Sequence, residues 1–248
     1  MSQALAETPY DLREIIENIV TEDDEPVDNL FSAKQQTLLK RALYASWTPQ
    51  PGEDQPKKQR RFLADVNVGI FFALHEQPLV PDFFLSLDVH PHKNWYDKEH
   101  RTYFVWEFGK VPEVTLEIVS NRKGNELTGK LKDYARMGVN YYVVYDPQKR
   151  LSKDVLCVYE LGFGKRYRPR KDHQLPDLGL GLTLWKGVFE DHEDTWLRWC
   201  DAEGRLIPTG EERAVQAEKR VASAEAEVEK LRAELARRTR KSARKRSK

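Results

Sequence analysis

The chain has 248 residues, of which 33% are charged and 10% are aromatic, with six tryptophans. This aromatic content is sufficient for a packed core and argues against a disordered chain. The sequence contains no apolar run long enough to span a membrane and no secretory signal at its start. Its two cysteines lack zinc-binding spacing. These features predict a cytoplasmic protein with no membrane contact.

The net charge of +1 conceals a strong asymmetry. Residues 237–248 hold eight lysines and arginines and no acid, which leaves −7 for the rest of the chain. Such a basic end is consistent with nucleic-acid contact, with a solvated terminus or with an arm that binds a partner. The charge alone does not choose between these three readings.

Hydrophobic periodicity predicts a helix, three strands, a second helix and a fourth strand, in that order. Before them, residues 1–31 are acidic and irregular, which predicts an N-terminal arm or a short helix. The second helix has Gly138 as its candidate C-cap, and Pro147 stops the fourth strand. The predicted ranges are 33–47, 62–72, 79–89, 111–120, 125–137 and 140–147.

The last third of the chain falls into two parts of different character. Short strand-like runs joined by glycine-containing turns occupy residues 154–208 and predict further antiparallel strands, so that 32–210 forms one domain. From 211 to 238, Ala214, Val221, Val228 and Leu235 stand seven residues apart. That heptad predicts a coiled-coil helix that forms a homodimer, followed by a basic disordered tail at 239–248.

Glu117 stands inside the apolar run of the third predicted strand, where an uncompensated carboxylate costs several kcal/mol, about the usual desolvation penalty. Asp82 opens the preceding strand directly after Pro81 and can reach the end of a neighbouring strand. Two carboxylates that converge from adjacent strands repel each other, and a shared Mg²⁺ is a common resolution. An ion pair between Glu117 and Lys130 or an arginine is the alternative.

The second predicted helix carries two lysines on different faces. Leu127, Leu131 and Tyr134 define its apolar face at a period of 3.6 residues. Lys130 falls at the border of that face and can lean over the sheet, whereas Lys132 points the opposite way into solvent. Lys130 is therefore the lysine expected near Glu117.

The elements "PD" at 81–82, "EIVS" at 117–120, a lysine on the next helix and "YARMGVNYYVVYDP" together resemble the Uma-type restriction endonuclease family. This family is a branch of the PD-(D/E)xK nuclease superfamily. The resemblance covers most of the chain from about residue 30. It implies an α/β (α+β) fold with a restriction-endonuclease-like αβββαβ core, here with additional antiparallel strands and a long C-terminal helix.

The resemblance implies that Asp82 and Glu117 are the metal ligands of a Mg²⁺ or Mn²⁺ site and that Lys130 completes the catalytic set. The superfamily pattern places its lysine two residues after the second acid, where this chain has Val119. In the Uma-type branch the lysine comes from the following helix, at the position of Lys130. Ser120 and Glu126 are expected to support the helix start and this lysine.

The implied function is a Mg²⁺-dependent DNA endonuclease that hydrolyses phosphodiester bonds. The alternative is an inactive nucleic-acid-binding or assembly protein that keeps the nuclease fold, with Glu117 and Lys130 as a structural ion pair. Basic side chains in a predicted hairpin turn and in the tail are the expected DNA contacts. They are Lys165, Arg166, Arg168, Arg240, Lys241, Arg244, Lys245 and Arg246.

Overall fold

The computed structural model describes most of the chain from residue 29 onward. The described residues are 29–51, 59–73, 76–90, 93–94, 96–97, 100–121 and 125–246, with side chains described up to 237. Nearly all of the predicted N-terminal arm at 1–31 lies outside them. Among the described residues, no helix has the length and apolar character needed to cross a membrane.

The described residues separate into two compact units. One comprises segments of Met1–Thr37, Asp65–Ser86 and His92–Asp172, and the other comprises segments of Leu38–Ala64, Leu87–Pro91 and His173–Lys248. Residues 32–210, for which the sequence predicted one domain, therefore contribute to both units.

The first unit is built on a mixed sheet in which β3, β5, β6, β7 and β8 lie side by side in that order. β5 and β6 are parallel and are connected by helix α4, whereas the other neighbouring pairs are antiparallel. The strands are β3 (Phe83–Leu87), β5 (Val114–Ile118), β6 (Tyr141–Tyr145), β7 (Leu156–Gly162) and β8 (Arg166–Pro169), and α4 is Gly129–Met137.

Every residue of β3, β5 and β6 is buried, which is typical of strands covered on both faces of a sheet. On one face, Tyr134 of α4 packs on Tyr142 with ring centroids 5.0 Å apart. On the other face, Phe31 of helix α2 (Leu30–Ser46) meets Tyr145 at 6.2 Å. The run of Val, Ile and Tyr that predicted these strands therefore builds the core on both sides.

The strand predicted at 62–72 is broken, and this expectation was wrong. The segment forms β1 (Phe62–Asp65), which lies largely in the second unit, and β2 (Ile70–Phe71) in the first. Asn67 between them has a φ of 53°, a left-handed conformation that cannot continue a strand. β2 pairs in parallel with β4 (Tyr103–Phe104), which leads directly into the short helix α3 (Val105–Phe108).

The second unit contains a long hairpin of β10 (Leu180–Phe189) and β11 (His192–Asp201). β9 (Gln174–Leu175) pairs with the free side of β10, and the 3₁₀ turn η2 (Pro176–Leu178) connects the two. The indole N–H of Trp199 donates to the carbonyl of Leu39 at 3.1 Å. This bond fixes the C-terminal half of α2 against β11.

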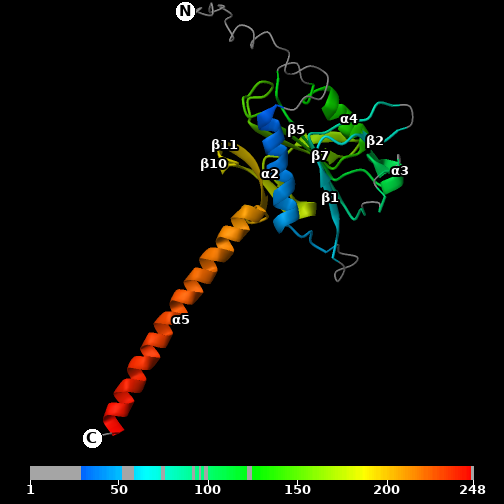
Figure 1. Cartoon of the computed structure of the whole chain (residues 1–248). Coiled ribbons are helices and arrows are strands. Elements are labelled where there is room, and N and C mark those ends of the chain that lie inside the picture. The colour runs from blue at the N-terminus through cyan, green and yellow to red at the C-terminus, as the bar shows by residue number, and fades with distance from the viewer. Residues whose placement is uncertain are drawn as a thin grey trace, which may run out of the picture. The chain divides into compact units, whose positions relative to one another are not determined.

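Helix α5 (Gly210–Arg246) is 37 residues long, and Figure 1 shows it, orange to red, as one uninterrupted helix. Thr209 and Glu212 form a reciprocal capping box at its start: the Glu212 N–H donates to Oγ1 of Thr209 at 3.2 Å, and the Thr209 N–H donates to Oε2 of Glu212 at 2.8 Å. The helix continues through residues 239–246, for which the sequence predicted a disordered tail, so that boundary is corrected to Arg246.

Candidate active site

Strand register brings the two predicted acids together. Phe83 of β3 lies opposite Leu116 of β5 in an antiparallel pair, so one further step places Asp82 opposite Glu117 on the same face. The Oδ2 atom of Asp82 accepts a hydrogen bond from the N–H of Ile118 at 2.5 Å. The start of β3 thus presents a carboxylate directly beside the buried acid of β5.

Glu117 is only 2% exposed, and both of its carboxylate oxygens are bonded. Oε2 accepts a hydrogen bond from Nζ of Lys130 at 2.7 Å, and Oε1 accepts one from the hydroxyl of Tyr134 at 2.7 Å. Both donors come from α4, where their spacing of four residues places them on one face. The helix and the strand therefore meet through this carboxylate.

Helix α4 carries Lys130 in its first turn and ends at Gly138, which adopts a left-handed φ of 102° and donates its N–H to the Tyr134 carbonyl. The Lys130 side chain is 30% exposed, and its ammonium contacts the Glu117 carboxylate. Lys132 is exposed to solvent, as the helical periodicity predicted. The structure thus selects the same lysine as the sequence.

Val119 occupies the position at which the superfamily pattern has its lysine. The side chain is 3% exposed, and its backbone N–H donates to the carbonyl of Tyr145 at 2.8 Å. A buried valine at this position has no charge to contribute. The ammonium beside the two acids consequently comes from α4 and not from β5.

Burial raises the pKa of Glu117 from its ordinary value of 4.5 to about 8. The Lys130 ammonium opposes this rise, and the negative charge of Asp82 adds to it. Burial lowers the pKa of Lys130, but Glu117, Asp82 and Glu126 together outweigh burial, so the pKa of Lys130 rises above 10.5. Lys130 therefore keeps its charge, and Glu117 is the group whose charge changes near neutral pH.

The raised pKa of Glu117 predicts a pH-dependent effect of Glu117→Gln on the melting temperature in EDTA. Between pH 4.5 and 8 the unfolded chain has released this proton and the folded chain has kept it, so rising pH destabilises the wild type by up to about 1.4 kcal/mol per pH unit. The variant has no such proton. Its melting temperature minus that of the wild type should therefore increase from pH 5 to pH 8.

The matched control for this pH series is Glu193→Gln, which changes an exposed glutamate in β11. Its difference from the wild type should stay nearly constant over the same range. A Glu117→Gln difference that is equally constant would contradict the raised pKa.

Sequence reasoning missed two amides that support Asp82. Nε2 of Gln36, in α2, donates to Oδ1 of Asp82 and to Oδ1 of Asn67, both at 3.1 Å. Nδ2 of Asn67 donates back to Oε1 of Gln36 at 3.2 Å. Gln36 is 2% exposed and stands three residues before Leu39, on the apolar stripe of its helix. A glutamine on such a stripe was the signal that could have found it.

Of the two predicted supporting residues, Glu126 has recognisable links to the constellation. Its backbone carbonyl accepts the hydroxyl of Tyr142 at 2.8 Å, and its charge raises the pKa of Lys130. One of its carboxylate oxygens, Oε2, is buried without a hydrogen-bond partner among the described residues. Ser120 is half-buried beyond the end of β5, and the described part of the chain records no hydrogen bond from it to these groups.

The three predicted nucleic-acid contacts whose side chains are described do not contact Asp82, Glu117 or Lys130. The Lys165 ammonium donates to the carbonyl of Arg136 at 2.9 Å, and Arg166 and Arg168 are exposed on β8. Strand register places Arg168 on the sheet face opposite to Glu117. The side chains of Arg240, Lys241, Arg244, Lys245 and Arg246 lie outside those described, so the role of all these residues stays a prediction.

The mixed α/β architecture, with β5, α4 and β6 carrying the acid and the lysine, is consistent with the restriction-endonuclease-like fold class. The model of the Uma2 family, described as "Putative restriction endonuclease", matches residues 14–185. The chain belongs to this family, as the sequence motifs indicated. No curated protein and no solved structure matches the chain.

Proposed function

We propose that this chain is a Mg²⁺-dependent endonuclease that hydrolyses phosphodiester bonds in DNA. The observation that supports it is the convergence of Asp82, Glu117 and Lys130, two carboxylates and an ammonium, where β3 begins and β5 ends. Membership in a family of restriction-endonuclease type supports the same reaction class. The proposal goes beyond that membership in assigning the metal, the substrate and the residues.

The donor set suits a hard divalent cation. Asp82 and Glu117 supply carboxylate oxygens, the ligand type that Mg²⁺ and Mn²⁺ prefer. The buried, unpartnered oxygen of Glu126 adds negative charge near Lys130. Among the described residues, no cluster of three or more acidic, histidine or cysteine side chains could hold a metal. Two carboxylates and water would thus hold the cation, which would polarise a phosphoryl oxygen and acidify bound water.

The protein side chains have separate roles in this proposal. The Lys130 ammonium orients the attacking water or stabilises the negative charge that develops on the phosphoryl oxygens. Tyr134 is a positioning residue, because its side chain is fully buried and its hydroxyl fixes one oxygen of Glu117. Gln36 positions Asp82 in the same way from α2.

The test of the proposal is cleavage of supercoiled plasmid DNA by the purified full-length protein. Nicked or linear product is expected with Mg²⁺ or Mn²⁺ and is expected to disappear with EDTA and in Glu117→Gln. If the wild type leaves the plasmid intact with either metal, or if Glu117→Gln cleaves at the wild-type rate, the endonuclease assignment fails.

Metal binding should also be visible as a rise in melting temperature, since a ligand that binds only the folded state stabilises it. Glu117 must lose its proton to bind a cation, and its pKa is about 8. Below that pH, the apparent Mg²⁺ affinity is expected to fall roughly tenfold per pH unit. A thermal-shift titration at pH 6, 7 and 8 measures this, and a shift that does not depend on pH would contradict it.

One observation favours a second candidate, an inactive protein that keeps the nuclease fold and binds nucleic acid or a protein assembly. Lys130 and Tyr134 already bond both oxygens of Glu117, so the buried acid is compensated by protein groups alone. This candidate predicts no cleavage and no Mg²⁺-dependent rise in melting temperature. Fluorescence anisotropy would then support the binding function if it showed equal DNA binding with and without Mg²⁺.

A further inference from the structure

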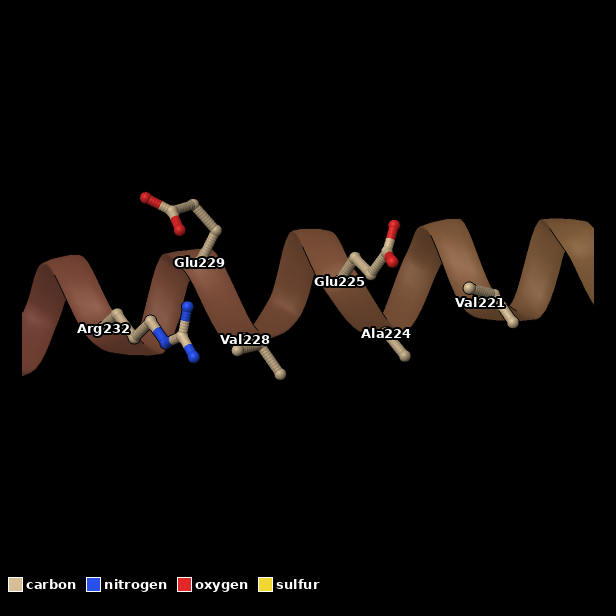
Figure 2. A pocket seen from close by; sticks show the side chains of 6 residues that line it. All are labelled: Val221, Ala224, Glu225, Val228, Glu229 and Arg232. Carbon is tan, nitrogen blue, oxygen red and sulfur yellow. The ribbon is translucent and has the colours of Figure 1, made fainter.

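Helix α5 exposes an apolar stripe along its length. Every described residue from 213 to 237 is exposed, including Val221, Val228, Leu231 and Leu235, whose exposed fractions run from 47% to 66%. Figure 2 shows Val221, Ala224 and Val228 on one side of the helix and the carboxylates of Glu225 and Glu229 on the other. The described residues of its own chain do not bury this stripe.

The spacing of the stripe specifies the kind of surface that would cover it. Its residues alternate at intervals of three and four, so they repeat every seven residues from Ala214 to Leu235. This period matches the contact seam of a left-handed coiled coil. Val221 and Val228 occupy the first apolar position of their heptads, and Leu231 occupies the second. This combination favours a parallel coiled coil of two helices.

We propose that a second copy of this chain covers the stripe, and that the two α5 helices form a parallel, in-register coiled coil over residues 214–235. The alanines at 214, 217 and 224 provide little apolar area. The pair is therefore a reversible dimer whose population depends on protein concentration.

The charges that flank the stripe fit the parallel arrangement. In a parallel pair, the residue that directly precedes the first apolar position of a heptad faces a residue of the partner helix five positions further along. Arg220 then faces the partner's Glu225, and Glu227 faces the partner's Arg232, so both contacts are attractive and each occurs twice. An antiparallel pair at full overlap would keep Arg220 near the partner's Glu227 but would place Glu225 beside the partner's Glu225.

No charged residue lies three or four positions from Arg220 along its own helix. The residues three and four positions away on its helix are Gln216, Ala217, Ser223 and Ala224. Its charge is therefore available to a second helix, and reversing it changes no ion pair within the helix.

The affinity test is sedimentation equilibrium of the full-length protein over a range of concentrations. Arg220→Glu turns both Arg220 contacts into repulsions and should raise the dissociation constant roughly tenfold. The double variant Arg220→Glu/Glu225→Arg exchanges the two charges and should restore the wild-type value. Lys219→Glu makes the same charge change on the side away from the stripe and should leave the value unchanged.

The orientation test is disulfide formation under mild oxidation, read on non-reducing gels. Leu235→Cys lies at the far end of the stripe, where only a parallel, in-register pair brings the two copies together. Ala236→Cys, one residue further along and off the stripe, is the matched control. The wild type controls for the native Cys157 and Cys200.

Rapid crosslinking of Leu235→Cys alone supports the parallel dimer. A chain that stays monomeric at all concentrations overturns the proposal, as does a dimer whose affinity is equal in Arg220→Glu and Lys219→Glu. Crosslinking that is no faster in Leu235→Cys than in Ala236→Cys overturns the parallel orientation.

Discussion

Replacing Lys130 by methionine is expected to reduce Mg²⁺-dependent cleavage of plasmid DNA by roughly a hundredfold or more, whereas Lys132→Met leaves the rate unchanged. Both lysines lie in α4, and both substitutions remove one positive charge from the same helix. Only Lys130 contacts Glu117, with its ammonium 2.7 Å from the carboxylate oxygen, while Lys132 is exposed to solvent. The two variants therefore show whether cleavage requires a positive charge beside Glu117 or only a positive charge on the same helix.

The expected loss comes from the transition state and not from metal binding. Methionine has nearly the length of lysine and keeps the packing of the aliphatic stem, so α4 should stay docked. The Mg²⁺-induced rise in melting temperature should therefore persist in Lys130→Met while cleavage is lost. Equal rates for the two variants, or a loss of both the metal response and the fold in Lys130→Met, would contradict a catalytic role for this lysine.

Replacing Glu212 by alanine is expected to destabilise the protein by about 2–3 kcal/mol, the largest effect on stability that we predict. The Arg198 side chain is 1% exposed, and its two terminal nitrogens donate to the Glu212 carboxylate at 2.7 and 2.6 Å. The Arg198 guanidinium also lies 4.8 Å from the ring centroid of Trp185. Alanine at 212 leaves this buried cation without its counter-ion and removes part of the capping box of α5.

The matched control is Glu211→Ala, which changes the adjacent acid in the same turn. Glu211 is mostly exposed, and among the described residues it forms one long ion pair, with Arg41 at 3.6 Å, so we expect a change of about 0.5 kcal/mol or less. Urea unfolding at neutral pH measures both.

Hydrogen bonds from Arg198 lower the pKa of Glu212, so the pair stabilises the fold above the ordinary carboxyl range and less as pH falls. Similar losses in both variants would contradict a dominant Arg198 pair.

The order of the core elements and the approach of Asp82, Glu117 and Lys130 followed from sequence patterns. The three residues lie on elements with clear periodicity, and strand alternation and helical spacing are local properties that survive folding. Their catalytic role stays a prediction. The structure adds that the ion pair and the site of converging acids, which the sequence left as alternatives for Glu117, occur at the same carboxylate.

Tertiary contacts account for what the sequence did not predict. Tyr134 was expected only to fill the apolar face of α4, but its hydroxyl reaches an acid 17 residues earlier in the chain. Gln36 and Asn67 pair across 31 residues, and no local pattern encodes that distance. The break in the strand predicted at 62–72 depends on the left-handed conformation of Asn67. Strand propensity averaged over the whole segment does not reveal a single residue of this kind.

The two carboxylates and the ammonium of the candidate site lie on elements that are expected to unfold at different stages. The carboxylates stand on fully buried strands, whereas Lys130 lies in the first turn of a nine-residue helix whose start has no side-chain cap. Such a turn opens more readily than the strands. We expect the amide protons of α4 to exchange with solvent faster than those of β5 and β6, and mild denaturant to separate Lys130 from Glu117 before the sheet unfolds.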